Sequence, residues 1–155
     1  MTDPWSAGTA ADWGRASGPR AGFWRRFGAW LIDGIIVGFV TEILDVALHR
    51  VLGSAVGLLA SIAYYCYFEG GPRGAGYGKQ TLGIRVIDAH TGYPIGYARA
   101  FVRWITQIIS TLIFFLGYLW MLWDPEKQCW HDKFAGDVVV PTAAYPVVAP
   151  GAARY

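Results

Sequence analysis

An arginine and an aspartate lie seven positions apart at the start of the first apolar run, Arg26 and Asp33. At about 100° per residue, seven residues return almost to the same face of an α-helix. The two side chains are then about 10 Å apart along the helix axis, which is too far for a direct bond. The long arginine can close part of this gap, or a neighbouring helix can supply the second partner. Arg103, at the start of a later apolar run, is the partner we expect.

A carboxylate at position 33 has two interpretations. A charged side chain at the centre of a membrane-spanning helix costs about 2.5–3.5 kcal/mol on insertion scales, so such an acid faces protein, pairs with a base or takes up a proton. Because burial disfavours the charged form of an acid, Asp33 is a candidate cation or proton site. Alternatively, the Arg–Asp pair is a structural tie that fixes how the helices pack. Position alone leaves both interpretations open.

A second polar group follows the last apolar run, at residues 130–133. Its histidine, His131, can titrate near physiological pH. His131 and Asp132 are adjacent and do not share a helix face, so their spacing does not indicate a catalytic dyad. A capping or packing role is favoured. Asp124 and Asp137 lie nearby in the sequence.

The remaining motifs argue against enzyme chemistry. The histidines at 49, 90 and 131 lack the spacing of metal ligands. Residues 78–81, GKQT, resemble the end of a phosphate-binding loop, but the upstream glycine pattern is missing. We therefore expect no enzyme activity, no cofactor and no metal site.

The composition indicates that a membrane positions these residues. The 155-residue chain is 54% hydrophobic and 15% charged, with a mean hydropathy of +0.31. Soluble domains average about 45–50% apolar and about 25% charged residues. The net charge of +2 is too small to indicate a nucleic-acid partner. The expected partner is a lipid bilayer.

Three apolar runs are long enough to cross a bilayer, which takes about 20 helical residues. They cover 27–48, 51–68 and 101–123. We therefore predict an all-α membrane protein with a small bundle of three transmembrane helices, or four if the third run breaks into two half-helices near Gly117.

Three further features complete the predicted fold. Gly53 and Gly57 form a GxxxG pattern, whose small residues allow close helix packing. A strand pattern at 83–88, turn residues at 90–92 and a return over 93–97 predict a short β-hairpin in a cytoplasmic loop. Disordered tails are predicted at 1–22 and 141–155, on either side of a membrane domain at 23–140.

The basic residues predict the orientation of the chain. Lys and Arg number four up to Arg26, one in the first connector and five in the loop 69–103. Because cytoplasmic loops are enriched in these residues, we expect the N-terminus and the long loop in the cytoplasm. A single third crossing places the C-terminal segment outside, whereas a re-entrant third element keeps it inside. The basic residues of that segment favour the second arrangement, but the number of crossings stays open at three or four.

Taken together, these segments resemble the RDD family of small bacterial membrane proteins. The stretches that carry the resemblance are GFWRRFGAWLIDG, GKQTLGIRVID and DPEKQCWHDKFAGDVVV, all within residues 21–140. The family is named for one arginine and two aspartates. The resemblance implies that Arg26 is the arginine, Asp33 the first aspartate and Asp132 the second, with Asp124 as the alternative.

The resemblance also implies a multi-pass protein of the bacterial inner membrane. One expected function is that of a transport component, for cation/proton exchange or for an unknown ligand, with a monovalent cation or a proton bound. Few spans then call for a second copy or another membrane protein as partner. The alternative is a non-transporting scaffold or interaction protein, in which a polar cluster of Arg26, Asp33, Arg103 and Asp132 holds the helices. His131 and Asp124 are secondary candidates for either role.

Overall fold

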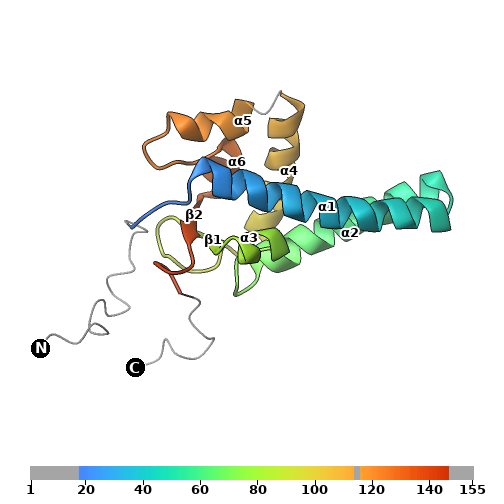
Figure 1. Cartoon of the computed structure of the whole chain (residues 1–155), viewed down its shortest axis with the longest axis horizontal. Helices are drawn as coiled ribbons and strands as arrows, with labels where there is room; N and C mark the ends of the chain where they lie inside the picture. The colour runs from blue at the N-terminus through green and yellow to red at the C-terminus, as the bar shows by residue number, and fades with distance from the viewer. Residues whose placement is uncertain (1–17, 114–115, 147–155) are drawn as a thin grey trace, which may run out of the picture.

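Two long antiparallel helices dominate the computed structural model, which describes residues 18–113 and 116–146 (Figure 1). Helix α1 spans Phe23–Ala47 and helix α2 spans Arg50–Gly70. The pair extends well beyond the rest of the molecule, and most of its large apolar side chains face outward. Both helices are long and apolar enough to cross a bilayer, in agreement with the first two predicted spans.

Two glycines of α2 allow it to pack closely on α1. A Cβ atom at Gly53 would overlap the backbone of Asp45, and one at Gly57 would lie 2.9 Å from Cγ2 of Thr41. The packing role predicted for this GxxxG pattern is therefore confirmed. Two glycines of α1, Gly34 and Gly38, face open space instead, with nothing within 4 Å of a Cβ position.

The third apolar run does not form one straight crossing; it breaks into two helical parts, which was the predicted alternative for the region near Gly117. Helix α4, Tyr97–Leu112, has 16 residues, or about 24 Å of length against about 30 Å of hydrocarbon core. Helix α5, Leu116–Leu119, and the 3₁₀ helix η1, Trp120–Leu122, follow it, and this second part is bent by 109° from α4. Within residues 18–113 and 116–146, two helices can cross a membrane, or three if the bent pair is one span. The predicted bundle of three or four crossings is thus supported only for its first two helices.

The predicted hairpin is wrong in its second strand. Strand β1, Ile84–Asp88, pairs antiparallel with β2, Asp137–Pro141, so that Val86 lies opposite Val139. Residues 93–97 form no strand. They contain Pro94, which lacks a backbone donor, whereas the three valines of β2 suit a strand that is buried on both faces.

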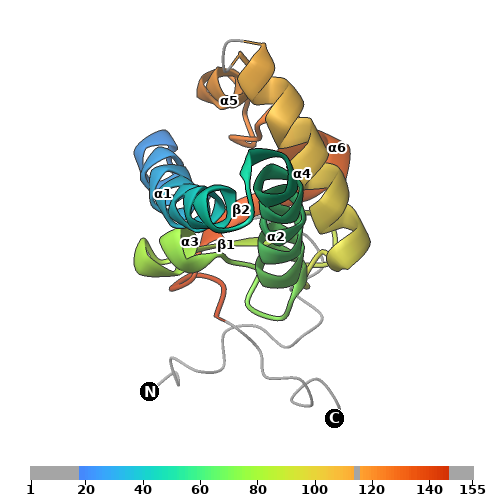
Figure 2. The same ribbon diagram turned by 90° about the vertical axis from the view of Figure 1, so that its right-hand side faces the viewer.

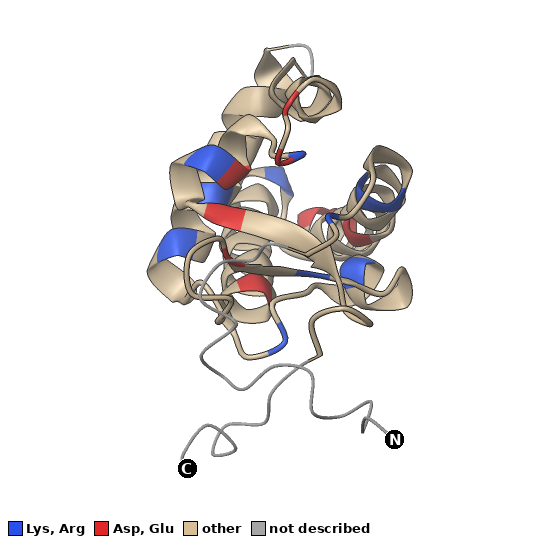
Figure 3. Ribbon diagram, turned by 90° about the vertical axis from the view of Figure 1, so that its left-hand side faces the viewer, with Lys and Arg blue, Asp and Glu red and all other residues tan. Residues whose placement is uncertain are grey.

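The sheet is the centre of a compact unit at the N-terminal end of α1. We call this unit the head; it comprises β1, β2 and the two short helices that pack around them. Helix α3, Tyr77–Thr81, and helix α6, Trp130–Ala135, pack around the sheet, and Figure 3 shows charged residues gathered on these elements and on the neighbouring ends of the long helices. The described tail residues, 18–22 and 141–146, lie against the sheet: Ala21 donates to the carbonyl of Val139, and Tyr145 packs on its other face. The rest of both predicted tails lies outside the described residues.

Candidate functional site

A buried ion pair joins residues that are 106 positions apart, Arg26 and Asp132. The Nη1 atom of Arg26 lies 2.5 Å from Oδ2 of Asp132, and the two side chains are 4% and 0% exposed. Helix α1 carries the arginine in its first turns, and α6 carries the aspartate. The structure thus brings together two residues that the sequence singled out, and it places α6 at the N-terminal end of α1.

Asp132 also caps the start of helix α6, in which it is the third residue. Its Oδ2 accepts a hydrogen bond from the backbone N–H of Cys129 at 2.8 Å, which completes a capping box. Gly136 ends the helix in the left-handed conformation, with φ of 67°. The capping role predicted for residues 130–133 is confirmed for Asp132, which therefore orders its own helix while it binds Arg26.

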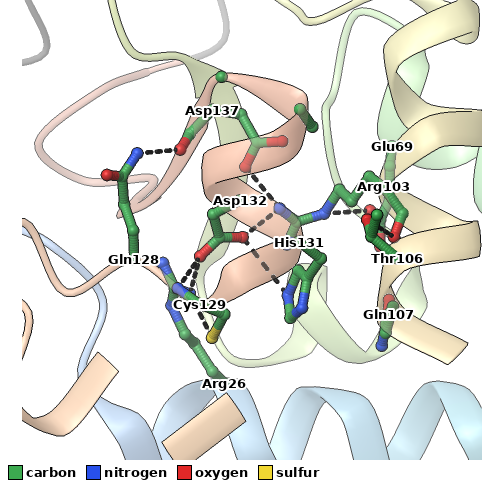
Figure 4. Close-up of polar contacts among 12 residues, drawn as sticks. Arg26, Glu69, Arg103, Thr106, Gln107, Gln128, Cys129, His131, Asp132 and Asp137 are labelled. Atoms are coloured by element: carbon green, nitrogen blue, oxygen red, sulfur yellow. Dashed lines mark hydrogen bonds and ion pairs between the residues drawn. The ribbon is translucent and has the colours of Figure 1, made fainter. Parts of the chain in front are cut away.

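Arg103 of α4 is surrounded by three carboxylates from three different elements (Figure 4). Its Nε donates to Oε2 of Glu69 at 2.8 Å, near the end of α2. Its Nη1 donates both to Oδ1 of Asp132 and to Oδ1 of Asp137, the latter at 2.5 Å. One guanidinium therefore links α2, α4, α6 and β2.

Asp33 contacts neither arginine. Its Oδ1 accepts hydrogen bonds from the hydroxyl of Tyr64 at 2.6 Å and from the backbone N–H of Gly78 at 2.8 Å. The nearest cation is Lys79, whose Nζ lies 4.0 Å from Oδ2 of Asp33. The expectation that Arg103 would partner Asp33 is wrong, because the donors of Arg103 are taken by other acids.

Lys79 connects the two parts of the site. Its Nζ donates to Oε1 of Glu69 at 2.6 Å, and the other oxygen of Glu69 binds Arg103. The contacts thus run without a break from Asp33 to Arg26. We call the set the ionic cluster, and every member is buried. Its members are Arg26, Asp33, Glu69, Lys79, Arg103, Asp132 and Asp137.

Three members of the cluster, Glu69, Lys79 and Asp137, were not predicted as site residues. Glu69 ends the second apolar run, where an acid next to a hydrophobic segment was a usable signal. Asp137 directly precedes three valines, so an acid at the start of a buried strand was another. Lys79 gave no such signal, because it lies in a loop with several basic residues.

The two aspartates bound to Arg103 differ in how readily they hold a proton. Burial opposes ionisation of Asp132, but Arg103 and Arg26 outweigh it and hold the pKa of Asp132 well below its usual range. Burial raises the pKa of Asp137 well above its usual range; Arg103 opposes this, and the nearby acids Asp132 and Glu69 add to it. Among the described residues, Oδ2 of Asp137 has no hydrogen-bond partner. This carboxyl group therefore holds a proton more readily than its neighbour.

Of the secondary candidates, His131 lies against a member of the ionic cluster and Asp124 does not. The Nε2 atom of His131 lies 3.4 Å from Oδ1 of Asp132, although the two residues are adjacent in sequence. Burial lowers the pKa of His131 to about 3, so its imidazole is neutral at physiological pH. Asp124 lies apart from the cluster and pairs with Lys133. Of the two alternatives for the second aspartate, the structure places Asp132 against Arg26.

Cys129, His131 and Asp132 lie close enough to one another to resemble a metal site. However, Nη1 of Arg26 lies 3.4 Å from the Cys129 sulfur as well as beside Asp132. Burial raises the pKa of the Cys129 thiol to about 12, which favours the neutral thiol. Arg26 already binds two of these three side chains.

Comparisons with known proteins agree with the resemblance seen in the sequence. A sequence model of the RDD family matches residues 20–136. The proline-rich antigen homolog of Mycobacterium tuberculosis is 36% identical over 87 residues, which cover 56% of this chain and 36% of that protein. The proline-rich antigen of Mycobacterium leprae is 33% identical over 86 residues, which cover 34% of its length. The matched part of the chain thus spans about a third of these mycobacterial relatives.

Two relatives from Bacillus subtilis match over most of their length. The uncharacterized protein YxaI is 27% identical over 139 residues, which cover 72% of this chain and 91% of YxaI. The uncharacterized membrane protein YteJ is 27% identical over 140 residues, which cover 81% of this chain and 83% of YteJ. No solved structure matches the chain significantly.

Proposed function

Because the chain belongs to the RDD family of membrane proteins, we propose that it is a component of a transport system in the bacterial inner membrane and that its ionic cluster binds an exchangeable proton. A relative that is similar over most of the chain, YteJ, is itself named a membrane protein. Two long apolar helices and a buried set of ionisable side chains suit this role, since such groups near a bilayer often mark ion or proton pathways.

The proposal rests on the charge imbalance of the ionic cluster. It contains three bases, Arg26, Lys79 and Arg103, and a carboxylate at each of the other four positions. With every group in its ordinary charge state, the cluster carries one surplus negative charge. A buried unpaired charge costs several kcal/mol, so a proton on Asp137 stabilises the cluster by removing the surplus.

A monovalent cation beside Asp137 removes the same surplus charge. A site that accepts either a proton or a cation, but not both, can exchange one for the other. Two or three crossings are few for alternating access, so a second copy of the chain or another membrane protein completes the pathway.

The proposed orientation has the N-terminus in the cytoplasm. The ion pair between Arg26 and Asp132 supports a head on the same side as the N-terminus, because Arg26 lies at the start of the first crossing. The basic residues of both segments favour the cytoplasmic side.

Proton-coupled flux in proteoliposomes tests the proposal. Purified protein is reconstituted with a pH-sensitive dye inside the vesicles, and a Na⁺ or K⁺ gradient is imposed. In wild type, protons are expected to move in the direction opposite to the flow of the cation. Asp137→Asn is expected to abolish this movement. The matched control is Asp124→Asn, since Asp124 lies outside the cluster and pairs with Lys133.

Equal flux in wild type and a folded Asp137→Asn variant contradicts the assignment of Asp137. Folding of the variant is checked by size-exclusion chromatography and thermal unfolding. Asp137→Glu serves as a second variant, because it keeps the carboxyl group and is expected to retain part of the flux.

A structural scaffold is the second candidate function. It is favoured by the number of elements that the cluster joins, since its contacts link α1, α2, α3, α4, α6 and β2. In this role the head, including the loop 69–99, docks a partner protein or lipid. Wild type without flux, with unfolding caused by every cluster substitution, favours the scaffold over the transport component.

A further inference from the structure

Helix α4 has an apolar face that no described part of the chain covers. Its residues follow the i, i+4, i+7, i+11 spacing of a single helix face, and each is at least 38% exposed. They are Phe101, Ile105, Ile108 and Leu112. The opposite face carries Arg103 and Ser110, which are 2% and 1% exposed. A helix with its charged face inside and its apolar face outside is suited to contact with lipid, not with water.

The direction of α4 differs from that of the long helices. Figure 1 shows α1 and α2 along the long axis with α4 running across them, and Figure 2 shows α2 end-on while α4 is seen from the side. The two views agree that α4 runs across the antiparallel pair of α1 and α2 instead of lying alongside it. If α1 and α2 cross the bilayer, α4 runs along the membrane plane.

Three contacts fix the position of α4 and α5 along the length of α1 and α2. Arg103 binds Glu69, near the end of α2. A Cβ atom at Gly70 would lie 2.8 Å from Cα of Tyr97, the first residue of α4. The ring of Tyr118 in α5 lies 6.4 Å from that of Trp30, about one turn beyond Arg26 in α1. The bent segment, α4 with α5, therefore lies at the end of α1 and α2 that is next to the head. This end is one boundary of the bilayer.

We propose that α4 lies in the plane of the membrane surface, with its apolar face among the acyl chains of one leaflet. The bilayer already surrounds the exposed apolar side chains of α1 and α2, and the face of α4 continues this surface at one end. Trp120 and Trp123, 46% and 76% exposed, follow α4 at the same level, where tryptophan prefers the interface between headgroups and acyl chains. The chain then crosses the membrane twice.

Depth measurements with nitroxide labels test this placement. The background is Cys66→Ala with Cys129→Ser, and each variant carries one of four labels: Phe101→Cys, Ile105→Cys, Ile108→Cys or Leu112→Cys. Depth is measured from collisions with oxygen and with a nickel chelate, in vesicles of phosphatidylethanolamine and phosphatidylglycerol. An in-plane helix gives four depths that agree within about 5 Å, one helical turn, whereas a crossing helix spreads them over about 16 Å.

Labels along an exposed face of α1 provide the matched control. Leu31→Cys, Ile35→Cys, Phe39→Cys and Ile43→Cys are expected to pass through the centre of the bilayer, because α1 crosses it. Ile109→Cys and Ile113→Cys, also exposed, replace any α4 label that disturbs the fold.

Three results overturn the proposal. A steady gradient of depth along α4 means that it crosses the bilayer. Low oxygen collision rates with coupling between labels mean that a second copy covers the face. High nickel collision rates at all four positions mean that the face is in water.

Discussion

Asp132 and Asp137 accept hydrogen bonds from the same nitrogen, Nη1 of Arg103, yet their surroundings shift their pKa values in opposite directions. Asp132 has a second arginine, Arg26, which favours its charged form. Among the described residues, Asp137 forms an ion pair only with Arg103, and one of its oxygens is left without a hydrogen-bond partner. The pair therefore combines a carboxylate that two arginines hold in its charged form with a carboxyl group whose pKa is raised by burial.

The ion pair between Arg26 and Asp132 is expected to stabilise the fold strongly. Removal of one partner leaves a buried charge, so Arg26→Gln or Asp132→Asn alone is expected to lower the free energy of unfolding by about 3–5 kcal/mol. The double variant is expected to lose less than the sum of the two. The measurement is a double-mutant cycle from unfolding of the purified protein in detergent. Additive losses would contradict direct coupling, and Glu126→Gln, in a partly exposed pair with Arg20, is a control expected to cost less than about 1 kcal/mol.

Glu69 is expected to be as sensitive as the residues that name the family. Its carboxylate binds both Lys79 and Arg103 in the buried cluster. Glu69→Gln therefore removes a negatively charged partner from both bases. The expected result is a loss of about 3–5 kcal/mol in the free energy of unfolding, measured in detergent. Glu42→Gln is the matched control, because Glu42 is an exposed acid in the other long helix. Equal stability of the two variants would show that Glu69 has no structural role.

The two long helices could be predicted from the sequence because length and hydropathy are local properties. Arg26 and Asp132 were identified by the resemblance, and Arg103, which was expected as the partner of Asp33, binds Asp132 instead. The assignment of Asp33 as the partner of Arg103 was wrong because helix geometry placed Arg26 and Asp33 on one face but could not show that α3, with Lys79, lies beside Asp33.

The sheet could not be predicted for a related reason. Ile84–Asp88 pairs with a strand about fifty positions later, and nothing local distinguishes this partner from the nearer residues 93–97. The apolar face of α4 resembles that of a membrane span in composition. Only its length, its bend and its direction across α1 and α2 separate it from one.

Close packing of the two long helices is expected to depend on the glycines of α2 and not on those of α1. Gly53→Ala places a methyl group against the backbone of α1, and Gly57→Ala places one 2.9 Å from Thr41. Each is expected to cost about 1–3 kcal/mol, as overpacking does. Gly34→Ala and Gly38→Ala are the matched controls, because open space surrounds them. Thermal unfolding in detergent measures all four, and equal effects would refute the observed packing of α1 on α2.

His131 is expected to make the fold sensitive to mild acid. Burial lowers its pKa from 6.5 to about 3, so the folded state binds fewer protons than the unfolded state between these values. The stability contributed by the neutral imidazole is present above pH 6.5 and is lost as the pH falls toward 3. His131→Gln removes this titration, and thermal unfolding between pH 7 and pH 5 is expected to show a flatter profile than wild type.

The exposed histidine His90 provides the control for this experiment, and His90→Gln is expected to leave the profile unchanged. A wild-type profile that is already flat over this range would show that His131 remains neutral in the unfolded protein or is accessible to protons when folded.

The central claim is that the ionic cluster holds an exchangeable proton on Asp137, and infrared spectroscopy of the reconstituted protein at neutral pH tests it directly. A protonated carboxyl group has a carbonyl stretching band that a carboxylate lacks. Wild type and Asp124→Asn are expected to show this band, and Asp137→Asn is expected to lose it. A wild-type spectrum without the band, or a band that persists in folded Asp137→Asn protein, would contradict the account.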